Sequence, residues 1–96
     1  MTIEKILRSA EECQQAGWQG YDIHFDGPVS REQILLWQSL GDLVYLSQLR
    51  QPFYRITGRS FLIKGLEGQT KLRIGFTAGF LDCADPDAVR QFLLLK

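Results

Sequence analysis

The stretch that decides the fold runs from residue 53 to residue 76 and reads FYRITGRSFLIKGLEGQTKLRIGF. Apolar and polar residues alternate along most of it, and breaks that contain Gly58 and Gly68 interrupt the alternation. Alternation is the pattern of half-buried strands, and glycine-containing breaks are typical of tight turns. We therefore predict an antiparallel meander of three strands over 53–76.

The register of this meander follows from the lengths of its turns. A two-residue loop at Gly58 and Arg59 sets the first hairpin, and a turn over 66–69 sets the second. The predicted pairs are Ile56 with Phe61, Tyr54 with Ile63, Ile63 with Leu72, and Phe61 with Ile74. All of these apolar residues then share one face, which we expect to be the core face.

The opposite face of the meander is the strongest candidate for a binding surface. It carries four cations with apolar residues between them, and we call it the basic face: Phe53, Arg55, Leu62, Lys64, Lys71 and Arg73. In the predicted register Lys71 lies beside Lys64, and Arg73 lies beside Leu62. Cations gathered on one face of a sheet favour an anionic or acidic partner.

Charge is divided along the chain although the net charge is zero. Residues 1–48 hold three cations against seven anions, a balance of −4. Residues 49–76 hold six cations against one anion, a balance of +5. The acidic part either neutralises the basic face within the chain, for example by cross-strand pairs, or leaves that face to an outside partner.

Two elements are predicted before the second helix begins. Apolar residues at Ile3, Ile6, Leu7, Ala10 and Cys13 recur at helical spacing, which predicts a helix over about 2–16. Residues 21–26 alternate strictly and predict a fourth strand, with Asp22, His24 and Asp26 on its polar side.

A capping box opens the second helix. Ser30 and Gln33 have the spacing for reciprocal caps, and Val29 can pack against Ile34. Helical spacing of apolar residues continues to Leu49, so the prediction is a helix over about 30–49. Because Gly41 invites a break, a short helix to Leu40 followed by a strand at Leu43–Leu46 stays open.

The C-terminal part predicts a third helix. Residues 77–84 form a glycine-containing connection, Asp85 is a cap, and Pro86 suits the first helical turn. The helix spans about 86–95. The chain is then one α+β domain over 1–96, with a mainly antiparallel four-stranded sheet and the order α-β-α-β-β-β-α; a ferredoxin-like arrangement is one topology that fits.

Composition places the chain among ordinary globular domains. At 96 residues it is large enough to fold around one core without a staple. No long apolar run predicts a membrane span, and no signal peptide is apparent, which favours a cytoplasmic location. Cys13 and Cys83 have no second cysteine near them, so free thiols are expected, and neither a metal nor a cofactor is indicated.

Four weaker candidates also have plain structural interpretations. Asp22, His24 and Asp26 could offer ligands to a metal or a proton carrier, but side chains two apart on a strand lie about 6 to 7 Å from each other, which favours a solvated polar face. Cys83 near a helix start is opposed by Asp82 and Asp85, which favours a structural thiol. Cys13 is predicted in the core, and the Gly75–Gly79 spacing favours a strand irregularity or a turn over a phosphate loop.

The function follows from the basic face and from the absence of a catalytic constellation. We expect a non-catalytic interaction or assembly module that meets an acidic helix of a protein partner or of a second copy. The alternative is a binder of a small anionic ligand, or a minor enzyme, that uses Arg55 and Arg73 with His24. Single-stranded nucleic acid comes third, because a pI near 6.5 is unlike strongly basic nucleic-acid-binding domains.

Overall fold

The computed structural model describes residues 1–9 and 18–95. They form an α+β fold with one six-stranded antiparallel sheet, two α-helices and a 3-10 helix. In chain order the elements are β1 (Ile3–Arg8), β2 (Trp18–Phe25), α1 (Arg31–Leu36), η1 (Trp37–Leu40), β3 (Asp42–Leu46), β4 (Phe53–Thr57), β5 (Phe61–Leu66), β6 (Lys71–Thr77) and α2 (Pro86–Phe92).

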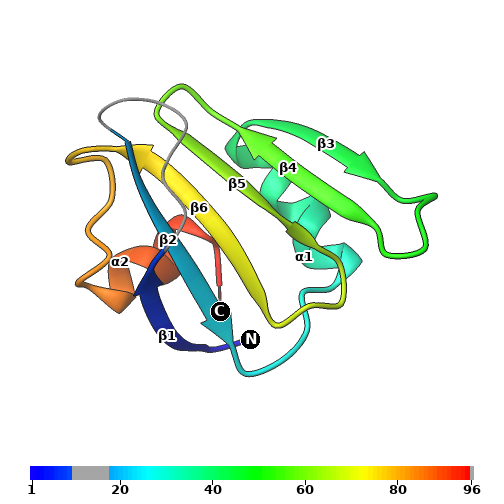
Figure 1. Cartoon of the computed structure of the whole chain (residues 1–96), viewed down its shortest axis with the longest axis horizontal. Coiled ribbons are helices and arrows are strands. Elements are labelled where there is room, and N and C mark those ends of the chain that lie inside the picture. Colours follow the sequence, from blue (N-terminus) through cyan, green and yellow to red (C-terminus); the bar gives the residue numbers. More distant parts are fainter. Residues whose placement is uncertain (10–17, 96) are drawn as a thin grey trace.

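The strands lie in the order β1-β2-β6-β5-β4-β3 (Figure 1). After β2 the chain crosses to the far edge through α1 and η1, and it returns through β3, β4, β5 and β6 by successive antiparallel connections. The last strand of this return, β6, therefore pairs with β2, the neighbour of the edge strand β1. The acidic first part of the chain and the basic second part meet at this pair.

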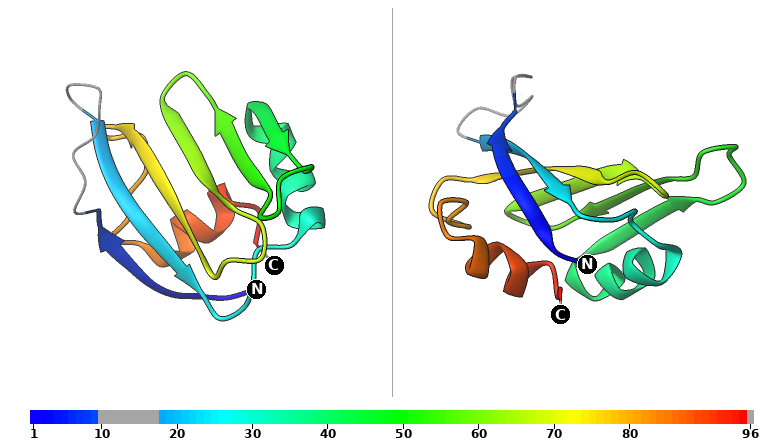
Figure 2. Two further views of the ribbon diagram at one scale, coloured as in Figure 1. Left: turned by 45° about the vertical axis from the view of Figure 1, so that its right-hand side comes forward. Right: turned by 90° about the horizontal axis from the view of Figure 1, so that it is seen from below.

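Both helices lie on one side of the sheet, and no described helix or strand covers the other side, which we call the open face (Figure 2). The core between them contains the inward residues of the central strands, including Ile23, Ile63 and Ile74, all fully buried. Trp37 of η1 is buried as well, and its indole Nε1–H donates to the Leu93 carbonyl at 2.6 Å. This bond joins the two helical segments beneath the sheet.

The predicted helix over 2–16 is wrong where the structure describes it, because Ile3–Arg8 is a strand. Its pairing with β2 has a register shift between Ile3 and Lys5. The shift places Ile3 opposite Phe25 and Ile6 opposite Ile23, so two residues three apart both face the core. An irregular strand thus imitates the spacing of a helix. Residues 10–16, and with them the prediction for Cys13, lie outside the described residues.

The long helix over 30–49 is also wrong, and the open alternative is confirmed. The helical part ends at Leu40, and β3 follows. A Cβ on Gly41 would lie 2.5 Å from the Thr57 carbonyl oxygen, so the chain turns here by close approach to β4. The predicted start is confirmed, because the Gln33 N–H donates to Ser30 Oγ at 3.1 Å.

The meander over 53–76 is present, but its register differs from the prediction by two residues. Ile56 pairs with Ile63, and Ile63 pairs with Ile74. The connection after β4 is longer than two residues, with the Gly58 N–H donating to the Phe61 carbonyl at 3.0 Å. Because side chains alternate with period two, a shift by two leaves every residue on its predicted face.

The predicted C-terminal helix is present, with the predicted start. Asp85 caps α2 by accepting from the backbone N–H groups of Asp87 and Ala88 at 3.1 and 3.4 Å, and Pro86 occupies the first turn. The helix ends at Phe92, earlier than predicted. With strands at β1 and β3, the predicted four-stranded sheet and the order α-β-α-β-β-β-α are incorrect in detail, and the ferredoxin-like arrangement does not describe the sheet.

Candidate binding face

The observed register brings three cations into one row across the sheet. Arg55 of β4 is paired with Lys64 of β5, and Lys64 is paired with Arg73 of β6. Paired residues project from the same face, and neighbouring strands lie about 4.8 Å apart. The prediction put Lys71 beside Lys64; the shift by two puts Arg73 there instead.

A second row of the basic face is mixed in character. Phe53 is paired with Leu66, and Lys71 is paired with His24 of β2. Phe53 and Leu66 are half-buried although neither helix covers this side, so they offer apolar contact area beside the cations. Leu62, opposite Gly75, extends the apolar part toward the other end of β5.

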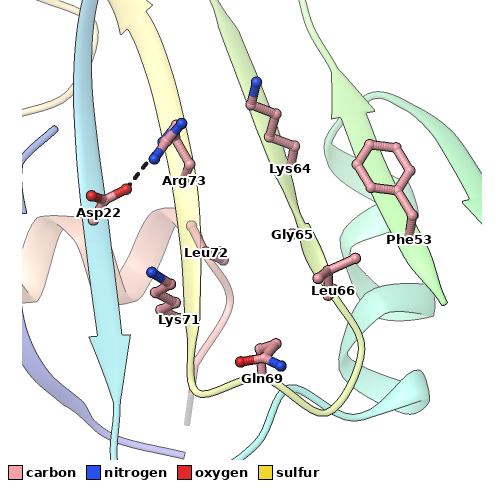
Figure 3. A pocket seen from close by; sticks show the side chains of 9 residues that line it. All are labelled: Asp22, Phe53, Lys64, Gly65, Leu66, Gln69, Lys71, Leu72 and Arg73. Carbon is pink, nitrogen blue, oxygen red and sulfur yellow. Dashed lines mark hydrogen bonds and ion pairs between the residues drawn. The ribbon is translucent and has the colours of Figure 1, made fainter. Parts of the chain in front are cut away.

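Four of the six predicted residues line a hollow of about 530 Å³ in this face (Figure 3). Its lining consists of Asp22, Phe53, Lys64, Gly65, Leu66, Gln69, Lys71, Leu72 and Arg73. Arg55 and Leu62 belong to the same face but lie outside the hollow, and so does His24. Leu66 and Gln69 were not predicted as site residues, because both belong to the turn predicted over 66–69. In the structure Leu66 ends β5 and pairs with Phe53.

One cation of the row is held by an acid of the same chain. Arg73 Nε donates to Asp22 Oδ1 at 3.1 Å, and the two side chains are 30% and 23% exposed. The intramolecular cross-strand pair expected from the charge division is therefore present at this position. Within residues 1–9 and 18–95, no acidic side chain pairs with Arg55, Lys64 or Lys71. These three keep their charge available to an outside group.

Gly65 lines the hollow with its backbone, and Tyr54 occupies the space on the core side of this glycine. A Cβ on Gly65 would lie 2.5 Å from the Tyr54 phenolic oxygen. Tyr54 is fully buried, and its hydroxyl has no hydrogen-bond partner among the described residues. Burial raises the pKa of this phenol well above its ordinary value, so it stays neutral.

The polar cluster on β2 is spread over separate partners. Asp22 pairs with Arg73, whereas Asp26 Oδ1 accepts from the backbone N–H of Thr2 at 2.8 Å and secures the start of β1. His24 lies between Lys5 and Lys71 in the sheet register. Among the residues that the structure describes, no three or more His, Cys, Asp or Glu side chains are placed to hold a metal ion. The arrangement favours the interpretation as a polar sheet face.

Cys83 is half-buried in the connection before α2. Burial raises its pKa to about 11, and the Asp82 carboxylate adds to the rise. Its thiol therefore stays protonated near neutral pH, which suits a structural role over a nucleophilic one. Gly79 has a φ of +83° next to a turn closed by the Phe80 N–H and the Thr77 carbonyl, in line with the predicted turn at Gly75–Gly79.

Comparison with known proteins leaves the geometry to carry the functional argument. None of the helices formed by the described residues is long and apolar enough to cross a membrane. No protein-family model, curated protein or solved structure matches the chain.

Proposed function

We propose that the protein is a non-catalytic interaction module whose basic face binds an acidic helix of a protein partner. The observation that carries the proposal is the row Arg55–Lys64–Arg73, which crosses three adjacent strands on the side of the sheet that neither helix covers. Arg55 and Lys64 of this row, and Lys71 near it, have no acidic partner among the described residues, and cations gathered on one sheet face attract a series of carboxylates.

The spacing of the row suits a helix laid across the strands. Neighbouring strands are about 4.8 Å apart, and helix residues three or four apart have Cβ atoms about 5 to 6 Å apart. Glutamates at that spacing can approach Arg55 and Lys64, while Arg73 is already paired with Asp22. Phe53, Leu62 and Leu66 offer half-buried area to the apolar residues that accompany such glutamates.

The proposed partner is a different protein and not the N-terminal segment of a second copy. The acidic helix expected over 2–16 is a strand at Ile3–Arg8, so that part of a second copy presents no helix. Nucleic acid is less well supported, because the net charge is zero, Asp22 already holds Arg73, and Phe53 is the one aromatic residue of the basic face.

The experiment measures binding of a fluorescent helix-forming peptide with glutamates at i, i+3 and i+7 and leucines between them. We expect binding that weakens as salt is raised. The double variant Lys64→Glu with Lys71→Glu should weaken it about tenfold or more, because both reversed charges face the peptide.

The matched control changes net charge by the same amount elsewhere. Arg50→Glu with Arg59→Glu reverses two exposed cations that belong to loops outside the basic face. This variant should bind the peptide nearly as the wild type does. Equal loss in both double variants, or tighter binding of a single-stranded oligonucleotide of the same charge, would contradict the proposal.

The hollow supports a second candidate function, the binding of a small anion. Its volume of about 530 Å³ lies in the range of small-molecule sites, and the free amino groups of Lys64 and Lys71 line it beside Phe53. The cations would then be the lysines and Arg73, with neither Arg55 nor His24 taking part. Citrate that displaces the peptide at submillimolar concentration, with loss of the effect in the Lys64 and Lys71 variant, would favour this candidate.

A further inference from the structure

We infer that β3 is a dimerisation edge, which pairs antiparallel with β3 of a second copy of this chain. Among the described residues, β3 pairs with β4 alone, so one side of its backbone has no strand beside it. A free strand edge presents unpaired N–H and C=O groups to a further strand. The inference does not depend on the proposed function of the basic face.

The two edges of the sheet differ in how they are protected. The β1 edge carries Glu4, Lys5 and Arg8, all exposed, and its pairing with β2 is irregular near Lys5. Charges and bulges are the devices that keep an edge from pairing with another chain. The β3 edge has a regular register, no proline, no lysine, and Asp42 as its one charged residue.

Exposed apolar side chains are concentrated in the segment of the chain that contains the unprotected edge strand. Eight large apolar residues of the described chain are exposed, and five of them fall between residues 35 and 49: Leu35, Leu36, Val44, Leu46 and Leu49. They belong to α1, to β3 and to the loop that follows β3. Five-residue strands alone bury little area, and a stable dimer buries roughly 1,000 Å² or more, so such side chains are the additional area that a second copy needs.

A two-fold axis at Val44 gives the second copy a compatible register. Leu43 then faces the second copy's Tyr45, and both residues are half-buried on the core side of the sheet. Asp42 faces the second copy's Leu46, so the two Asp42 carboxylates lie about 13 Å apart along the strands. The pairing therefore places no like charges opposite each other, so electrostatic repulsion does not oppose the dimer.

The same register joins the open faces of the two copies. Val44 is paired with Arg55 and so stands at the β3 end of the row that continues through Lys64 and Arg73. Antiparallel pairing about an axis perpendicular to the sheet keeps both open faces on one side. The dimer would therefore be one continuous sheet with two basic rows pointing the same way.

The test is sedimentation equilibrium of the full chain over about 1 to 500 µM. We expect a concentration-dependent mass that approaches twice the 11.0 kDa of the chain. Val44→Lys should raise the dimer dissociation constant about tenfold or more, because it puts two ammonium groups together at the axis. Leu7→Lys is the matched control, since Leu7 stands at the β1 end of the same row and is exposed to a similar degree.

A wild type that stays monomeric throughout would overturn the inference, and so would equal weakening by Val44→Lys and Leu7→Lys. Circular dichroism and urea unfolding check that both variants fold. If Val44→Lys does not fold, amide hydrogen exchange of the wild type decides instead. We then expect protection of the Asp42–Leu46 amides to rise with protein concentration while protection of the Ile3–Arg8 amides stays constant, and constant protection at both edges would refute the dimer.

Discussion

At the scale of single residues, Tyr54 and Gly65 show how the core and the basic face constrain each other. The Tyr54 ring fills the space on the core side of the sheet that a side chain at residue 65 would need, so only glycine fits at this position, whose backbone lines the hollow. The Tyr54 hydroxyl is buried and has no hydrogen-bond partner among the described residues. An unpaired buried hydroxyl costs about 1 to 3 kcal/mol.

Tyr54→Phe should therefore leave the free energy of unfolding unchanged or raise it by about 1 kcal/mol. The effect should grow above pH 10. The folded state holds the Tyr54 pKa above its ordinary value of 10.0, so the unfolded chain loses this proton first and wild-type stability falls as pH rises. Tyr54→Phe removes this contribution to the loss of stability at high pH. Urea unfolding at pH 7 and pH 10.5 measures both effects.

Tyr21→Phe is the control, because it removes a phenol from the half-buried Tyr21 and leaves Tyr54 in place. A loss of well over 1 kcal/mol in Tyr54→Phe at pH 7 would mean that the hydroxyl has a partner in solution.

The side of the sheet on which a residue lies could be predicted from sequence, whereas its cross-strand neighbour could not. Ile56, Ile63 and Ile74 are buried as expected, although all four predicted pairings are replaced by others in the structure. Alternation reports the face alone, and register depends on the conformation of the turn after Thr57. For the candidate site, alternation predicted which residues share the basic face. It did not predict that Arg55, Lys64 and Arg73 form one row across the strands.

At the scale of elements, sequence patterns identified where the two α-helices begin better than how long they are. The Ser30 cap and the Asp85 cap are local hydrogen-bonding patterns, and both are present. At the sheet edges, β1 was missed and β3 was expected only as the alternative to a longer helix, because an irregular register in one and the adjacent Gly41 in the other obscure the period-two pattern. Their apolar spacing imitates a helix, and the sheet that overrides it is a tertiary effect.

Ser30→Ala should lower the free energy of unfolding by about 1 kcal/mol, because the Gln33 N–H loses its side-chain acceptor at the start of α1. The six-residue α1 has few internal hydrogen bonds, so its cap matters more than in a long helix. Urea denaturation gives the value directly. Ser39→Ala is the control, since the Ser39 hydroxyl donates to the Leu36 carbonyl within η1 and caps nothing. Equal losses in the two variants would argue against a capping role for Ser30.

At the scale of the whole molecule, the pairing of β2 with β6 joins the two charged parts of the chain. The strand class and the α+β architecture could be predicted, because they depend on local patterns. The strand order could not, because β2 and β6 are about fifty residues apart and no local signal brings them together. The Asp22–Arg73 pair is the point at which the charge division along the chain becomes a contact.

This contact should appear as a coupling energy between Asp22 and Arg73. Asp22→Arg places two cations opposite each other across β2 and β6, and Arg73→Asp places two carboxylates there, so each should cost about 1 kcal/mol. The double variant exchanges the charges and should recover about 0.5 to 1 kcal/mol of the summed loss, less at 1 M salt. Urea unfolding of the four proteins completes the cycle.

The pair Asp87 and Arg90 on α2 is the matched control, because its atoms are 3.8 Å apart and its side chains are 81% and 50% exposed. Exchange of those charges should give a coupling near zero, since solvent screens an exposed pair that is held by one helix turn. If the Asp22 and Arg73 losses add without recovery, Arg73 is not held by Asp22 in solution.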